Sequence, residues 1–236
     1  MVSDGSSPGE KQSQEAVTPR DAASLVLVRD GARGPEVLMG KRPDSSRFMP
    51  GVYVFPGGGV EEDDYKLETE FPLPGHVVER MARQSEEPLA RALAWAAVRE
   101  TWEETGILLG APGPAHNPRN CETLSAYDTA GLAPDLTGLD YLMRAVTPPY
   151  LPIRFNTRFF IVDAGQAQGR LEPRPELEHV TWHSIEEALD LHIINVTAIV
   201  LNAACDYWQE RPKPNASRPS PMFTQYEPGE IILRDE

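Results

Sequence analysis

Short apolar, β-branched runs separated by turn residues open the foldable part of the chain. Residues 23–28 and 36–41 are two such runs, and the cluster Gly31-Ala32-Arg33-Gly34-Pro35 lies between them. This pattern is typical of a β-hairpin. Residues 52–55 predict a third strand, because Pro56 and the glycines after it would end the run.

Residues 89–105 carry the clearest helical pattern of the sequence. Pro88 stands near the start of this run of strong helix formers, and Gly106 is placed to cap its end. At 100° per residue, one stripe contains Leu89, Leu93, Ala96 and Ala97, and it continues into Glu100, Glu103 and Glu104. The opposite side bears Val98 and two tryptophans that we assign to the core, Trp95 and Trp102.

The remaining pattern is less regular. Residues 65–87 are mixed and charged, with a short helix expected around residues 76–83, and residues 110–150 predict a long loop with some short helix. Strands are expected at residues 154–163 and 179–182. The sequence Ser184-Ile185-Glu186-Glu187 is a capping box that opens a short helix, and Asn195 is expected to cap a last helix ending near Trp208.

Helices and strands that interleave without βαβ regularity predict an α/β fold, an α/β/α sandwich with a mixed β-sheet. We expect residues 1–20 to form a disordered N-terminal tail, residues 21–208 to form one domain, and residues 209–236 to form an extended C-terminal segment. The proline-rich part of that segment, residues 211–221, is expected to run over the surface. Residues 65–87 are expected as an insertion within that domain.

Composition limits the kinds of partner and site that fit this chain. A net charge of −14 repels polyanions, which argues against nucleic acid or an anionic membrane as the main partner. Metal cations can still bring a phosphorylated small molecule to an acidic protein. Cys121 and Cys205 show no zinc-ligand spacing and no disulfide framework, and no apolar run has the length of a membrane span, so we expect a cytoplasmic protein.

The three glutamates at the end of the predicted helix are the strongest candidates for chemistry. A solvated acidic patch explains most Glu-Glu pairs, but here the acids continue a core-facing stripe, and Arg99 alone cannot neutralise them. Clustered carboxylates on a rigid helix suit Mg²⁺ or Mn²⁺. Upstream, the glycines after Phe55 and Pro56 let the backbone approach a ligand closely, and Asp63 and Asp64 follow.

Together these residues resemble the Nudix box, G-x5-E-x7-R-E-U-x-E-E-x-G-U, where U is apolar. Gly58 matches the opening glycine, Asp64 stands in place of the first glutamate, and Arg99 to Ile107 match the second half, with Thr101 at an apolar position. Residues 65–87 interrupt the box. An insertion at this place is similar to the branch that contains the mammalian peroxisomal coenzyme A diphosphatases, and the resemblance covers about residues 20–208.

The resemblance implies a Nudix-type sandwich and specific roles. Glu100, Glu103 and Glu104 would bind the metal with the Gly57 carbonyl, Asp64 would lie beside the metals, and Arg99 would orient Glu103 and Glu104. The general base would be a box glutamate or a later acid, here Glu176 or Glu178. The residues assigned to substrate binding are Arg42, Phe55, Arg158, Arg80 and Arg83.

The implied activity is metal-dependent hydrolysis of a small-molecule diphosphate, X-P-O-P-Y, to X-P and Y-P, with coenzyme A or an acyl derivative as the first substrate. A histidine-containing motif precedes the box in those enzymes and is missing between Gly40 and Gly58, so ADP-ribose, NADH and nucleoside triphosphates stay open. A catalytically silent nucleotide-sensing module is the alternative, which the retained glutamates disfavour. The insertion is either a pocket wall or a surface excursion. A homodimer fits the resemblance, and residues 233–236 do not match a peroxisomal Ser-Lys-Leu signal.

Overall fold

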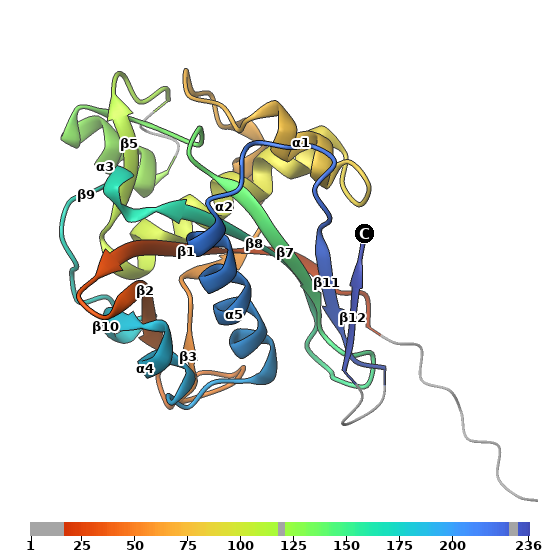
Figure 1. The fold of residues 1–236 in the computed structure, drawn as a ribbon. Coiled ribbons are helices and arrows are strands. Elements are labelled where there is room, and N and C mark those ends of the chain that lie inside the picture. The colour runs from red at the N-terminus through yellow and green to blue at the C-terminus, as the bar shows by residue number, and fades with distance from the viewer. Residues whose placement is uncertain (1–16, 118–120, 227–230) are drawn as a thin grey trace, which may run out of the picture.

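The computed structural model describes residues 17–117, 121–226 and 231–236. Its main feature is a nine-stranded sheet (Figure 1). The strands of this sheet are β1 (Arg20–Gly31), β2 (Gly34–Lys41), β3 (Tyr53–Val54), β4 (Gly57–Gly59), β7 (Asp140–Val146), β8 (Phe155–Asp163), β10 (Glu178–Ser184), β11 (Pro221–Thr224) and β12 (Ile232–Asp235). Their order is β10-β2-β1-β8-β7-β11-β12, with β3 added to β2 and β4 added to β1. The β1–β8 and β7–β11 pairs are parallel and the others antiparallel, which confirms the mixed sheet.

Helices cover both faces of this sheet and give the predicted α/β/α sandwich. The helices and short 3-10 segments are η1 (Glu62–Lys66), α1 (Gly75–Met81), α2 (Glu87–Thr105), α3 (Glu122–Ala130), η2 (Ala164–Gln166), α4 (Ile185–Leu189) and α5 (Asn195–Glu210). A second, small sheet has the order β6-β5-β9, formed by β5 (Leu108–Pro112), β6 (Leu132–Pro134) and β9 (Ala167–Gln168).

Strand β1 shows how the core is divided. Leu25 and Leu27 pack in one apolar cluster with residues of α1 and α2, whereas Val26 and Val28 pack in the other with residues of α4 and α5. Neighbouring residues of a strand point to opposite faces, so a strand covered on both sides is apolar throughout. The apolar run at residues 23–28 is therefore the signature of a central strand, and α2 and α5 lie on opposite faces of the sheet (Figure 1).

Several predicted elements are confirmed. The long helix runs from Glu87 to Thr105, and Gly106 ends it in the left-handed conformation at φ 78°. Its two sides are both buried, including Trp95 and Trp102. The Ser184 hydroxyl and the Glu187 carboxylate form the reciprocal bonds of a capping box at α4.

Residues 110–150 do not form the predicted long loop, although the short helix expected among them is present as α3. This stretch holds the end of β5, then α3, β6 and β7, and the turn residues fall between these elements. Gly131, for example, ends α3 at φ 69°. Asn195 is the first residue of α5 rather than its cap, because Ile194 occupies the capping position.

The insertion and the segment after α5 both contain residues that pack against the rest of the domain. The proline-rich stretch expected to run over the surface is mostly exposed and carries no helix or strand up to residue 219, whereas strand β11 after it pairs with β7 and with β12. Within the insertion, Leu73, Val77 and Met81 are buried in the same apolar cluster as α2, so the surface-excursion alternative is wrong. The predicted disordered tail, up to residue 16, lies outside the described residues. In the ranges that the structure describes, none of the helices combines the length and apolarity needed to cross a bilayer.

Candidate active site

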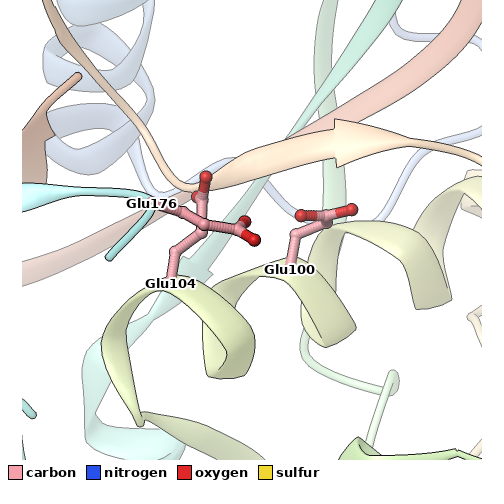
Figure 2. A group of neighbouring side chains, drawn as sticks. All are labelled: Glu100, Glu104 and Glu176. Carbon is pink, nitrogen blue, oxygen red and sulfur yellow. The ribbon is translucent and has the colours of Figure 1, made fainter. Parts of the chain in front are cut away.

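Three carboxylates from two separate segments meet at the end of helix α2. Glu100 and Glu104 lie one turn apart on α2, and Glu176 comes from the segment that precedes β10. One oxygen from each lies within 4.8 Å of the others (Figure 2). Glu104 is only 5% exposed, Glu100 is half-buried and Glu176 is exposed. We call Glu100, Glu104 and Glu176 the acidic cluster.

Burial makes negative charge costly in this cluster. Burial is the main reason that the pKa of Glu100 rises to about 7, and the charges of Glu103 and Glu176 add to the rise while Arg99 opposes it. Burial also holds the pKa of Glu104 well above its usual range, against the hydrogen bond from the Gly57 N–H. A cation that replaces the protons would relieve this cost. The donor set, three carboxylates with hard oxygens, fits Mg²⁺ or Mn²⁺.

The backbone of the glycine run, residues 57–59, lies in close contact with these carboxylates. The Gly57 N–H donates to the Glu104 carboxylate at 2.9 Å, which links β4 to α2. A side chain at Gly58 would overlap the Glu100 carboxylate, and one at Gly57 would overlap Ser24. The backbone therefore lies close to these side chains, and only glycine permits this at the two positions.

Arg99 organises the acids beside the cluster. Its guanidinium donates to both oxygens of Asp64, at 2.9 and 3.1 Å, and to the Gly59 carbonyl at 3.0 Å. It also contacts Glu100 and Glu103 at 2.9 Å each. The sequence predicted that Arg99 orients Glu103 and Glu104, whereas its contacts in the structure are with Glu103 and Glu100.

Glu103, a predicted metal ligand, and Asp64, predicted to lie beside the metals, are both outside the acidic cluster. Glu103 accepts hydrogen bonds from Arg99 and from the Thr123 hydroxyl, the latter at 2.8 Å. Asp64 is buried and its carboxylate is engaged by Arg99 and by the Glu61 N–H. The other base candidate, Glu178, is an exposed residue of β10 opposite Lys41 and is not part of the cluster.

A cavity of about 710 Å³ extends from the acidic cluster. Of the predicted substrate residues, Arg42 and Phe55 line it, and Arg42 is the one cationic side chain that the described residues place in its lining. The rest of the wall is mainly apolar and comes from β1, the loop before β3, the β7–β8 connection, β8, the start of α5, and β11. Representative residues are Phe48, Met49, Leu151, Phe159, Val196 and Phe223. These are ordinary core residue types, so the sequence carried no signal for them.

Three arginines assigned to substrate binding are not in this cavity. Arg158 is 1% exposed and contacts Asp21 and the Ser85 hydroxyl. Arg80 is 2% exposed and pairs with Asp140 at 2.8 Å. Arg83 donates to the backbone carbonyl of Glu236. The guanidiniums of Arg158 and Arg80 are buried among protein partners, whereas exposed Arg83 contacts the backbone after β12. The insertion contributes no residue to the cavity wall among those described.

Comparisons with known proteins support this fold. A crystal structure of a Nudix hydrolase from Alicyclobacillus acidocaldarius is 34% identical, with a TM-score of 0.62 over 80% of this chain and 92% of that one. This chain belongs to the Nudix hydrolase family. Two curated relatives are a nudix hydrolase of Caenorhabditis elegans, 28% identical over 72% of this chain, and the acyl-coenzyme A diphosphatase NUDT19 of Gallus gallus, 34% identical over 40% of this chain. The match spans 53% and 33% of those relatives, so the chain corresponds to about half or less of their length. No protein-family model matches.

Proposed function

We propose that this protein hydrolyses a diphosphate linkage in a small molecule, X-P-O-P-Y, to X-P and Y-P, in a reaction that depends on Mg²⁺ or Mn²⁺. The observation that carries the proposal is the acidic cluster at one end of the cavity. In the reaction, water adds its oxygen to one phosphorus, the bridging P–O bond breaks, and the other phosphate leaves. Family membership supports this reaction class.

The glutamates of the acidic cluster differ in burial, and we assign them different roles for that reason. Glu100 and Glu104, held by Arg99 and by the Gly57 N–H, would hold the cation, with the Gly57 carbonyl as a further ligand. Glu103 would support the site indirectly through its ion pair with Arg99. A bound divalent ion supplies neutralisation of phosphate oxygens and a lowered pKa of water. Glu176 is the exposed member of the cluster, so it is the carboxylate best able to accept the proton of the attacking water.

The cavity wall supports a substrate with an apolar arm. Phosphate groups fit the end formed by the acidic cluster once cations are bound, with Arg42 nearby, whereas Phe48, Phe159 and Phe223 offer aromatic surface to the rest of the substrate. Acyl-coenzyme A combines a diphosphate with a long pantetheine and acyl chain. The name of the Gallus gallus relative, an acyl-coenzyme A diphosphatase, points to the same class. We therefore propose acyl-coenzyme A ahead of coenzyme A, ADP-ribose, NADH and nucleoside triphosphates.

Product analysis by chromatography tests this proposal. Purified protein with Mg²⁺ or Mn²⁺ is incubated with each of these five substrate types, and a chelator is added to a parallel sample. We expect two products from acyl-coenzyme A, an acyl-phosphopantetheine and adenosine bisphosphate, and no products with the chelator. We also expect a kcat/KM about tenfold above that for ADP-ribose, since each buried methylene adds to apolar binding. A preference for a phosphate ester without a diphosphate would contradict the activity. Binding without turnover across the whole panel would favour a silent sensor.

A further inference from the structure

Arg80 joins three parts of the chain that are far apart in sequence. It lies on α1, within the insertion, and its guanidinium donates to the Asp140 carboxylate at 2.8 Å and to the Tyr141 carbonyl at 2.6 Å, both in β7. The same group donates to the carbonyls of Arg218 and Pro219, at 3.3 and 3.2 Å. These two carbonyls belong to the segment that leads into β11. One side chain therefore ties the insertion and the C-terminal segment to the central sheet.

Asp140 is the centre of this junction. Besides Arg80, it accepts hydrogen bonds from the Arg218 guanidinium at 2.7 Å and from the Tyr207 hydroxyl at 2.8 Å. Arg83, one turn beyond Arg80, reaches the Glu236 carbonyl past the end of β12. Figure 1 shows the chain leaving α5, passing beside α1 and then turning into β11. The insertion thus contacts the C-terminal segment just before β11 and just after β12, at the end of this antiparallel pair where Pro221 is opposite Asp235.

The strand held in this way forms part of the cavity. β11 runs parallel to β7, with Phe223 opposite Ala145. Phe223 and Ala145 both line the cavity, and so does Gln225, which accepts a hydrogen bond from the Tyr150 hydroxyl at 3.4 Å. The insertion lines no part of this cavity itself, but it contacts the segment that does.

We propose that the insertion acts on substrate binding at a distance, with Arg80 as a positioning residue that fixes β11 so that Phe223 packs against the apolar arm of the substrate. This inference rests on the proposed function for the identity of the substrate. A guanidinium suits the task because one planar group serves a carboxylate and three carbonyls at once. A lysine keeps the charge beside Asp140 but cannot reach all four acceptors.

Hydrogen exchange tests the positioning role without any substrate. In the full chain, Arg80→Lys should raise amide exchange rates in β11 and β12 about fivefold, the factor for losing a hydrogen bond of ordinary strength, with α2 unchanged. Arg91→Lys is the matched control, because Arg91 is an exposed arginine of α2 that contacts Glu87. Equal exchange in β11 for Arg80→Lys and wild type would overturn the proposal. If Arg80→Lys fails to fold, Arg83→Met should raise exchange in β12, and no change there would overturn it too.

Kinetics then separate positioning from general damage. Arg80→Lys should raise KM for acyl-coenzyme A about fivefold with kcat within about twofold, and should leave KM for ADP-ribose unchanged. Phe223→Leu should raise KM similarly, and the double variant should add little, since both changes act on one contact. Equal KM changes for both substrates would overturn the proposal. If wild type cleaves neither substrate, the proposed function fails, while hydrogen exchange still decides whether Arg80 holds β11.

Discussion

Replacing Glu104 by glutamine is expected to lower kcat/KM by at least about 10²-fold, because even groups that only support a metal ligand are worth 10–100-fold. Glu104 is the most buried member of the acidic cluster, and burial holds its pKa well above the usual range, so it has the most to gain from a cation. Glutamine keeps the shape of the side chain and an oxygen to accept from the Gly57 N–H. The loss should therefore come from chemistry rather than unfolding.

Steady-state kinetics at saturating Mg²⁺, with thermal melting of each variant, measure this loss. Glu87→Gln is the matched control at the opposite end of α2, where the exposed Glu87 pairs with Arg91. Glu103→Gln should fall between them, because Glu103 contacts Arg99 and Thr123 rather than the cluster. A Glu104→Gln enzyme with activity within about threefold of wild type would show that the cluster does not hold the catalytic metal.

Replacing Arg99 by methionine is expected to lower the free energy of unfolding by about 3–5 kcal/mol, the usual cost of removing one partner from a buried ion pair. The substitution would leave Asp64 and Glu100, both largely buried, without the guanidinium that pairs with them. It would also cut the connection between η1 and α2, which lie on the two sides of the insertion.

Denaturant unfolding of metal-free protein measures this effect. Arg91→Met on the exposed side of the same helix is the control, and it should change stability by about 0.5 kcal/mol or less, as exposed pairs do. Arg99→Lys should fall between the two variants, since an ammonium cannot bridge Asp64 and Gly59 as the guanidinium does. A loss under about 1 kcal/mol for Arg99→Met would mean that the desolvation of Arg99 already offsets its ion pairs.

The sequence predicts best where one periodicity explains many residues. Helix α2 follows from its apolar stripe, from Pro88 and from Gly106, and the stripe correctly directs Glu100 and Glu104 toward the interior. The central strand β1 follows from its unbroken apolar run. These signals are local, so a single segment contains all the information needed.

The parts that the sequence could not predict depend on partners far along the chain. Glu176 was one of two loop acids until the fold placed it beside Glu104. Arg80 and Arg158 looked available for phosphates because their partners, Asp140 and Asp21, lie 60 and 137 residues away along the chain. The sequence did not reveal strand β7, because turn residues surround it, although β7 pairs with the C-terminal strand β11. Long-range ion pairs leave no periodic pattern, so only the folded structure reveals them.

The most direct test of the central claim is to locate the metal. Crystals of the protein soaked in Mn²⁺ should give an anomalous difference peak between the carboxylates of Glu100, Glu104 and Glu176, and crystals of Glu104→Gln should lack that peak or show it much weakened. A peak at this place would establish the acidic cluster as the metal centre. Ordered Mn²⁺ bound elsewhere, with none among these three carboxylates, would contradict the account.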